Sequence, residues 1–580
     1  MKRCPQCNRV EADDALAFCR ADGTPLVGAS SSLVGEGGAA RHGDDSASSE
    51  IETSILPHTT DAGVSRATAP TTALPYEQPA GTTRELKRPK RGPALLAFML
   101  LIVAASAVAC YFYLAKRESK AVQSIAVMPF VNESGDADAE YLSDGMTETL
   151  ISSLSQLPNL SVKARSSVFR YKGKDADAKT VGRELNVQAI LNGRVMQRGD
   201  QLTLTLELVD APTENVLWSE QYNRRQADIV SLQSEIARDV LSKLKPRLSG
   251  ADEAKVTKKY TVDPEAYELY LKGRFQWNKR GGDSLRQAAG FYQQAIEKDP
   301  GYALAYAGLA ETYSLYPDYS VASPQDSFPK SKAAALRALE LDDSIAEAHT
   351  ALGRYYNYWE WNRAEAEREY RRAIELKPNY ATAHHWLGTD TLAQLKRFDE
   401  AIAEAKLAEE LDPLSPIIAT NLADTLLFER RYDEAIAQYR HSLTLDPNFY
   451  FTYVGMSNTL ATKGEYGEAI ALQRKAMELS NDPIEKGYLA FSLAKSGRRD
   501  EALKLLDELK REASAGYVPS YAVGLAYLDL KQKDEAFVWL EKDADEHGIT
   551  AAFYAVDPLL DDLRPDPRFA DLLRRVGFRQ

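Results

Sequence analysis

Three cysteines near the N-terminus have the residue types and spacing of metal ligands. Cys4 and Cys7 form a C-x2-C pair, Cys19 follows after eleven intervening residues, and Asp22 lies three residues beyond it. Thiolates at this spacing suit tetrahedral Zn2+. A segment of about 25 residues needs a bound metal to stabilise its fold, because its apolar core is too small. The sequence therefore predicts a Zn2+ site made by Cys4, Cys7, Cys19 and Asp22. A metal-free, redox-sensitive tail is the alternative.

The same segment carries a resemblance. CPQC followed by FCRADGTPL resembles the zinc-ribbon start, of the form CPxC…FCxxDGTxL, that heads some bacterial regulatory proteins. Asp22 departs from a four-cysteine site, so it must ligate through oxygen or leave that position to water or a partner. The segment's charges balance, and the whole chain carries 71 Lys and Arg against 84 Asp and Glu, a net charge of −13. This balance argues against nucleic-acid binding, which needs a basic surface.

Other motifs that could support catalysis are weak. Gly173-Lys174 lacks the upstream glycine and the following Ser or Thr of a phosphate loop. His384 and His385 are neighbours in a helical pattern, so their imidazoles point about 100° apart and cannot share one ligand. We expect His384 in the packing core and His385 at a groove-facing position. Because no nucleophile, base and orienting residue come together, the sequence predicts a non-enzymatic protein.

A membrane span is predicted between the cysteine-bearing segment (1–26) and the rest of the chain. Residues 27–93 are rich in Ser, Thr, Ala, Gly and Pro and end in a basic stretch, which is typical of a disordered linker. Residues 94–115 are uncharged and would extend about 33 Å as a helix, enough to cross a bilayer. The heavier basic flank precedes this span. This charge bias predicts that the N-terminus is cytoplasmic and that residues 116–580 are exported across a bacterial inner membrane.

Residues 124–248 alternate between strand and helix patterns and predict an α/β domain. The second arm of a predicted hairpin places Leu202, Leu204, Leu206 and Leu208 on one face. Ser143 or Asp144 is expected to cap a helix. Strands are expected at 124–130, 160–169, 189–196, 201–210 and 216–222, and helices at 145–157, 178–185 and 228–248.

This region also resembles a known domain. The stretches IAVMPFVNESGDADAEYLSDGMTETLISSLSQLPNLSV, VGRELNVQAILNGRV and LWSEQYNR resemble the TolB N-terminal/FlgO-like domain of bacterial envelope and signalling proteins. The resemblance implies a docking or sensing module with no chemistry of its own.

The second half of the chain repeats with a period of about 34 residues. Alanines recur at intervals of 35, 34, 34, 33 and 34 residues, at Ala366, Ala401, Ala435, Ala469, Ala502 and Ala536. Small residues, aromatic residues and a closing proline recur in register with them, which is the tetratricopeptide pattern. We expect about eight repeats over 263–547, followed by a segment, 548–580, whose last helix begins at Asp566-Pro567 and caps the array.

The predicted fold is therefore multidomain: an α/β domain, an all-α tetratricopeptide superhelix, one transmembrane helix and a small zinc-ribbon-like segment. Residues 124–580 are similar to the sensor half of a broad bacterial family, in which that half is fused to cyclases, kinases or winged-helix regulators. The motifs of those modules do not precede the predicted span in this sequence.

The concave face of such a superhelix binds extended peptides or helices. The sequence thus predicts a scaffold that binds protein partners through an exported groove and could connect envelope events to the zinc-ribbon-like head. A receptor for a small molecule or cell-wall fragment, bound by the TolB-like domain, is the alternative. By repeat phase the predicted groove residues are Thr382, His385, Thr389, Ile417, Thr420, Asp424, Phe451, Val454 and Asn458.

Overall fold

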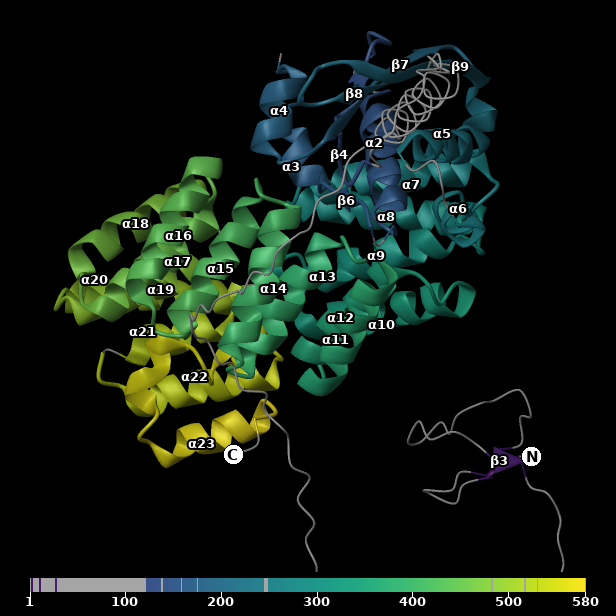
Figure 1. Ribbon diagram of the computed structural model, residues 1–580. Coiled ribbons are helices and arrows are strands. Elements are labelled where there is room, and N and C mark those ends of the chain that lie inside the picture. Colours follow the sequence, from purple (N-terminus) through teal and green to yellow (C-terminus); the bar gives the residue numbers. More distant parts are fainter. Residues whose placement is uncertain are drawn as a thin grey trace, which may run out of the picture. The chain divides into compact units, whose positions relative to one another are not determined.

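A computed structural model divides the chain into two compact units, Met1–Met99 and Leu100–Gln580 (Figure 1). In the first unit, the strands β1 (Lys2–Arg3), β2 (Val10–Glu11) and β3 (Val27–Gly28) pair antiparallel in the order β2-β1-β3. The residues that the structure describes are 2–3, 10–11, 27–28, 122–136, 139–157, 159–174, 176–244, 249–480, 483–515, 518–528 and 530–578.

Several predictions for the N-terminal part lie outside these described residues. They are the four predicted zinc ligands, the linker beyond Gly28 and the span at 94–115. Strand β3 coincides with the first two residues of the predicted linker, because its backbone pairs with β1. Within the described ranges, no helix combines the length and the apolar character needed to cross a membrane.

A six-stranded mixed sheet forms the centre of the α/β region. Its order is β6-β4-β7-β8-β9, with β5 beside β7; β4 runs parallel to β6 and β7, whereas β7, β8 and β9 form an antiparallel meander. The predicted hairpin is confirmed, and Gly199 occupies its turn with a φ of 62°. The strands are β4 (Ser124–Val127), β5 (Val131–Asn132), β6 (Ser161–Val162), β7 (Ala189–Arg198), β8 (Gln201–Asp210) and β9 (Val216–Arg225).

Helices α2 and α5 pack on the sheet face that carries the four leucines of β8 (Figure 1). Those leucines are at most 1% exposed, so the predicted alternation is confirmed. The helices of this region are α2 (Glu140–Leu154), α3 (Arg165–Phe169), α4 (Ala178–Glu184), η2 (Gln226–Asp228), α5 (Ile229–Leu244) and α6 (Gly250–Val256).

Two local predictions for this region were wrong. The strand expected at 160–169 ends at Val162, and α3 follows at Arg165, because Lys163 and Ala164 turn to bond the repeats. The helix expected from Gly145 begins already at Glu140, so Ser143 and Asp144 lie within its first turns and do not cap it. Asp177, by contrast, does cap α4 and accepts a hydrogen bond from the Thr180 amide at 2.7 Å.

Eight consecutive helix pairs follow in the described residues, and the tetratricopeptide pattern is confirmed. In the second pair the connection between the two helices contains η3 (Pro317–Tyr319). The paired helices are α7 (Pro264–Asn278) and α8 (Gly282–Lys298), α9 (Ala303–Leu315) and α10 (Pro324–Leu341), α11 (Ala346–Tyr358) and α12 (Arg363–Leu376), α13 (Ala381–Trp386) with η4 (Leu387–Leu392) and α14 (Phe398–Leu411), α15 (Pro416–Phe428) and α16 (Tyr432–Leu445), α17 (Tyr450–Lys463) and α18 (Tyr466–Leu479), α19 (Ile484–Lys495) and α20 (Arg499–Ala515), and α21 (Ser520–Leu528) and α22 (Lys533–Asp545).

The chain ends in η5 (Ile549–Phe553), η6 (Pro558–Leu563) and α23 (Pro567–Arg575). The predicted start of the last helix is confirmed: Asp566 accepts a hydrogen bond from the Arg568 amide at 3.0 Å, and a proline occupies the first turn. Helix α23 packs on α22, where Arg568 Nη1 lies 2.7 Å from Asp534 Oδ1.

A glycine in the first helix of several pairs receives a tyrosine ring from a neighbouring helix. A Cβ atom built on Gly353 would lie 2.6 Å from Cε1 of Tyr370, and Gly308 and Gly455 meet Tyr292 and Tyr439 at the same distance. These rings are fully buried and cannot withdraw. Gly353 therefore leaves space for a ring of its own pair and sets the spacing of its two helices, whereas Gly308 and Gly455 receive a ring from the preceding pair.

We predict that Gly353→Ala destabilises the repeats by about 1–2 kcal/mol, because the added methyl overlaps the Tyr370 ring. This loss outweighs the gain of up to about 1 kcal/mol in helix propensity that alanine brings. Urea unfolding followed by circular dichroism measures the change in midpoint.

Gly290→Ala is the matched control, since Gly290 lies inside α8 and nothing within 4 Å would meet its Cβ. This variant should be as stable as the parent protein or more stable. Equal destabilisation by both substitutions would show that the ring contact does not limit the spacing.

Candidate functional site

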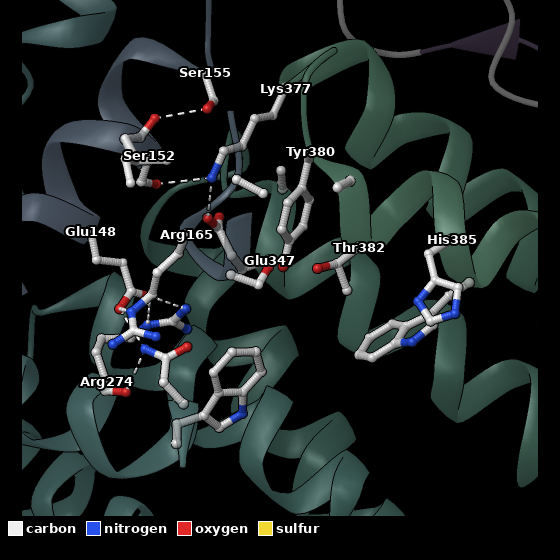
Figure 2. Close-up of a pocket in the computed structure, with 18 of the residues that line it drawn as sticks. Glu148, Ser152, Ser155, Arg165, Arg274, Glu347, Lys377, Tyr380, Thr382 and His385 are labelled. Carbon is white, nitrogen blue, oxygen red and sulfur yellow. Dashed lines mark hydrogen bonds and ion pairs between the residues drawn. The ribbon is translucent and has the colours of Figure 1, made fainter. Parts of the chain in front are cut away.

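A cavity of about 670 Å3 lies inside the second unit (Figure 2). Its walls come from α2 and α3 of the α/β region, from the first helices of successive repeats, and from η5 near the C-terminus. In Figure 2, Glu148, Arg165 and Arg274 lie together on one side of the view, and Tyr380, Thr382 and His385 lie on the other. The size falls within the range of ligand sites in proteins, about 300–1,000 Å3.

The α/β region closes this cavity because its loops bond directly to the repeats. Lys163 Nζ donates to the carbonyl of Glu410 at 2.7 Å, and the Ser166 and Ser167 hydroxyls donate to the Asp412 carboxylate. Lys163 and Glu410 are 247 residues apart in sequence. These contacts join the α/β region to the repeats, two parts of the chain that the sequence analysis predicts as separate domains.

A second set of contacts comes from the α12–α13 connection. Lys377 Nζ donates to Ser152 Oγ at 2.9 Å and to Glu347 Oε1 at 2.8 Å, as Figure 2 shows. Asn379 Nδ2 donates to the carbonyl of Leu160 at 2.7 Å. The α/β region is thereby held against both the third and the fourth helix pairs.

Three arginines and Glu148 form one polar wall of the cavity, and the buried Glu311 contacts this wall from outside the cavity lining. Arg274 Nε donates to Glu148 Oε1 at 2.7 Å, and its Nη1 donates to Glu311 Oε2 at 2.9 Å. Arg165 Nε lies 3.3 Å from the second oxygen of Glu148. The third arginine, Arg280, also lines the cavity. Glu148 thus joins α2, α3 and α7 through charge-assisted contacts.

A second charged group surrounds Arg354. Its Nη2 donates to both oxygens of Asp318, at 2.9 and 2.7 Å, and its Nη1 lies 3.5 Å from Asp390 Oδ2. Burial raises the pKa of Asp390 to about 6. Asp390 belongs to η4, one turn of π-helix that sequence reasoning missed. Such turns are frequent at functional sites, and here the turn brings Thr389 and Asp390 to the cavity wall.

The two neighbouring histidines have separate environments, as their helical spacing implies. His384 is buried between Glu404, whose Oε2 lies 2.6 Å from Nδ1, and the Pro378 carbonyl at 3.1 Å from Nε2. His385 lines the cavity, and its Nε2 lies 3.0 Å from Asn421 Nδ2. Burial lowers the pKa of His385 to about 3, so the ring is neutral and accepts the amide hydrogen.

The structure places the predicted groove residues in three settings. Two cavities account for eight of them, and Asp424 and Phe451 line both. Thr420 lines neither: it is buried and hydrogen bonds Ser442 and Thr452 between helices. The larger cavity is lined by Thr382, His385, Thr389, Ile417, Asp424 and Phe451, and the smaller one, of about 190 Å3, by Asp424, Phe451, Val454 and Asn458.

The segment 547–563, called here the return segment, crosses the concave face of the repeats. Its Phe553 ring stacks on Phe428 with 5.4 Å between centroids and lies 6.3 Å from Tyr358. Arg363 donates to the carbonyl of Ala552 at 3.2 Å and to that of Val576 at 3.0 Å. The C-terminal region was expected only to cap the last repeat. It also fills part of the groove, because its aromatic side chains bury against earlier repeats.

Two further contacts fix the return segment. Arg430 Nη1 donates to the Val556 carbonyl at 2.7 Å. The His547 ring lies between the indoles of Trp359 and Trp361, with centroid distances of 4.2 and 4.6 Å. Sequence reasoning missed this arrangement, since the two partners lie almost two hundred residues apart. The paired tryptophans were the one local signal.

Comparisons with known proteins agree with this division of the chain. Residues 120–239 match the family model described as HilA/YgeH-like transcriptional regulator, second domain, and residues 418–449 and 452–483 match the tetratricopeptide repeat model. The TolB N-terminal/FlgO-like resemblance expected for the first of these regions is not among these matches.

Two curated relatives share part of the chain. "Putative adenylate cyclase 3" of Rhizobium meliloti (strain 1021) is 34% identical over 231 residues, which are 40% of this chain and 39% of that protein. "Transcriptional regulator HilA" of Salmonella typhimurium is 23% identical over 230 residues, 40% of this chain and 41% of that protein. The chain therefore spans about two fifths of the length of these relatives.

Solved structures show a likeness in fold alone. The tetratricopeptide protein YrrB, described as having an unusual peptide-binding site, is 24% identical with a TM-score of 0.24, covering 33% of this chain and 93% of that one. The pilus biogenesis factor PilW is 18% identical with a TM-score of 0.30, covering 35% and 92%. Scores this low carry no functional argument.

We predict that Asp424 makes the stability of the repeats depend on pH. Burial raises the pKa of Asp424 to about 7, and Tyr439 Oη donates to its Oδ1 at 2.5 Å. In the unfolded chain the carboxyl ionises near pH 4, so between about pH 4 and pH 7 only the folded state keeps the proton. The free energy of unfolding should therefore fall as pH rises through this window.

Asp424→Asn should remove up to about 4 kcal/mol of this fall, because the amide oxygen still accepts from Tyr439 and never ionises. Urea denaturation at the two ends of the window measures it. Asp433→Asn is the control, since Lys463 holds the pKa of Asp433 below its usual value. An unchanged slope in Asp424→Asn would contradict the prediction.

Proposed function

We propose that this chain is a non-enzymatic, membrane-anchored interaction protein whose repeats bind a segment of a partner protein. The observation that carries the proposal is an aromatic cluster at the concave side, made by Phe449, Tyr450 and Phe451. Their rings are only partly buried, with centroids 5.6 Å apart for Phe449 and Phe451 and 4.0 Å apart for Tyr450 and Phe451. Partly exposed aromatic rings beside a cavity are the usual anchors of protein interfaces.

The cavities support this choice of surface. Phe451 and Asp424 line both cavities, and Asn458 lies in the wall of the smaller one. The return segment covers the opposite wall with Phe553 and Asp557. A partner segment would insert an apolar side chain beside Phe451 and hydrogen bond Asn458, so it binds next to the return segment rather than along an empty groove.

The remaining parts of the proposal concern the N-terminal residues. We propose that residues 94–115 span a bacterial inner membrane with the N-terminus in the cytoplasm. The cytoplasmic head would hold Zn2+ through Cys4, Cys7, Cys19 and Asp22, and the α/β region would act as a TolB-like docking module. The scaffold would then relay envelope signals to that head.

A receptor for a small molecule or a cell-wall fragment is the second candidate. The 670 Å3 cavity favours it, because this cavity is closed by the α/β region on one side and by the repeats on the other. Binding there would stabilise the contact between these two regions.

The partner site predicts that crosslinking in cells captures a defined protein on the concave surface. The parent chain is compared with Phe451→Ala/Asn458→Ala, which removes an anchor ring and an amide from the cavity wall. We expect the crosslinked product, identified by mass spectrometry, to fall at least about fivefold, since an anchor side chain contributes 1 kcal/mol or more.

Arg474→Ala is the matched control, because Arg474 lies on α18 with 53% of its side chain exposed and does not line either cavity. Capture should persist in this variant. If both variants lose the product equally, or if the double variant keeps it, the concave surface is not the docking site.

Topology and zinc binding are tested together by thiol labelling. No cysteine occurs between Tyr111 and Gln580, so Ser514→Cys places a single exposed thiol on α20. A membrane-impermeant maleimide should label this thiol in intact spheroplasts. It should label Cys4, Cys7 and Cys19 only after permeabilisation and removal of zinc with a chelator, because metal-bound thiolates are protected.

Labelling of the thiol introduced by Ser514→Cys only after lysis would refute the exported topology. Labelling of the N-terminal thiols without a chelator would refute the zinc site. The parent chain, which keeps Ser514, is the control for reaction elsewhere.

A further inference from the structure

Arg280 is a guanidinium in the cavity wall without an acidic partner. It is partly buried and lies 3.7 Å above the ring of Trp277, and among the described residues it makes no ion pair and no side-chain hydrogen bond. Burial lowers its pKa, and the nearby Tyr319 and Glu311 oppose this shift. A charged group withdrawn from water without a partner is costly, so such a position is maintained where a partner arrives from outside.

The neighbouring carboxylates cannot fill this role. Both oxygens of Glu311 are engaged, one by Arg274 at 2.9 Å and the other by the Tyr380 hydroxyl at 2.6 Å. Glu148 is shared between Arg165 and Arg274. The two glutamates next to the three arginines are therefore already engaged, and Arg280 is the arginine without an ion pair among the described residues.

A second polar group at the same wall also lacks a partner. The indole Nε1 of Trp277 is buried, and no acceptor lies within hydrogen-bond reach among the described residues. Trp277 is 5% exposed and lines the cavity. A buried donor without an acceptor destabilises the protein, and it indicates a missing group that accepts hydrogen bonds.

The backbone of Arg280 has the left-handed conformation that recurs in the turns between paired helices, as at Lys396, Arg430 and Lys531. Its φ is 50°, in the left-handed region, directly after the end of α7. Glycine or asparagine is the usual residue in that conformation. This conformation belongs to the repeat turn, and it places Arg280 where its side chain lines the cavity.

We propose that the cavity between the α/β region and the repeats binds a small organic oxyanion, with its carboxylate or phosphate held by Arg280 and its ring or apolar body lying against the aromatic walls. The guanidinium fork matches the paired oxygens of either group. The body would contact Tyr270, Tyr302 and Trp386, which are at most 9% exposed and line the same cavity. Phe451 of the proposed partner surface lines the same cavity, whereas Arg280 belongs to the anion site alone. The anion site gives the second candidate function a ligand class.

Ligand-observed fluorine NMR on the whole chain tests the proposal. The probes are para-fluorobenzoate, para-fluorophenyl phosphate and, as the neutral control, para-fluorobenzyl alcohol. We expect line broadening for at least one of the two anions and none for the alcohol. The two anions distinguish a carboxylate ligand from a phosphate ligand.

Arg280→Gln removes the charge while keeping a side chain of similar length. It should weaken binding of the anion about tenfold or more, which is the usual effect of losing a charged hydrogen bond. Arg286→Gln is the matched control, because Arg286 is an exposed arginine on α8 paired with Asp283. This control should bind as the parent chain does.

The proposal would be overturned if Arg280→Gln broadened the anion signal as much as the parent chain does, or if the alcohol signal broadened. The absence of broadening with both anions in the parent chain would overturn it too. Circular dichroism of Arg280→Gln excludes loss of folding, and Arg280→Lys, which keeps the charge, should retain part of the affinity. Partner capture through Phe451 does not enter this readout, so the two proposals fail separately.

Discussion

Glu148 lies between the guanidinium groups of Arg165 and Arg274, and the rest of the site depends on this ion cluster. It joins α2 and α3 of the α/β region to the first helix of the repeats. Glu148, Arg165 and Arg274 are all largely withdrawn from solvent, so removing one partner leaves a buried charge unpaired, a cost of about 3–5 kcal/mol. The cluster therefore stabilises one relative placement of the two regions. The cavity exists because that placement leaves space between them.

Close packing also governs the repeats and the C-terminus. Glycines such as Gly353 accept a tyrosine ring, which brings paired helices close together. The return segment contacts the earlier repeats, where the Arg363 and Arg430 side chains donate hydrogen bonds to its backbone carbonyls. These bonds satisfy carbonyl groups that would otherwise be buried without donors. The concave face is consequently divided into a large cavity beside the α/β region and a smaller one beside the return segment.

Sequence reasoning succeeded where the signal is local. The hairpin with its four inward leucines, the repeat period and the start of the last helix each depend on residues within one element or its neighbour. It failed at 160–169, where tertiary bonds from Lys163 and Ala164 to the repeats replace a strand. For the site, repeat phase placed His385 and Asp424 on the cavity wall correctly. The repeat phase did not show that the Thr420 side chain lies in the interface between helices. It fixes the direction of a side chain only to within one residue position along the helix.

By itself the sequence determined the classes of element in the α/β region and the repeats, their order, and most of the residues that face the concave side. Periods of two and about 34 residues are properties of the chain alone. Only the tertiary structure decided which charges are paired. Arg274 and Arg280 lie six residues apart in sequence, yet one meets two carboxylates and the other meets none among the described residues. Charge pairing depends on the groups that arrive from distant segments: Glu311 from α9, Glu148 from α2 and, across 213 residues, Arg363 at the Val576 carbonyl.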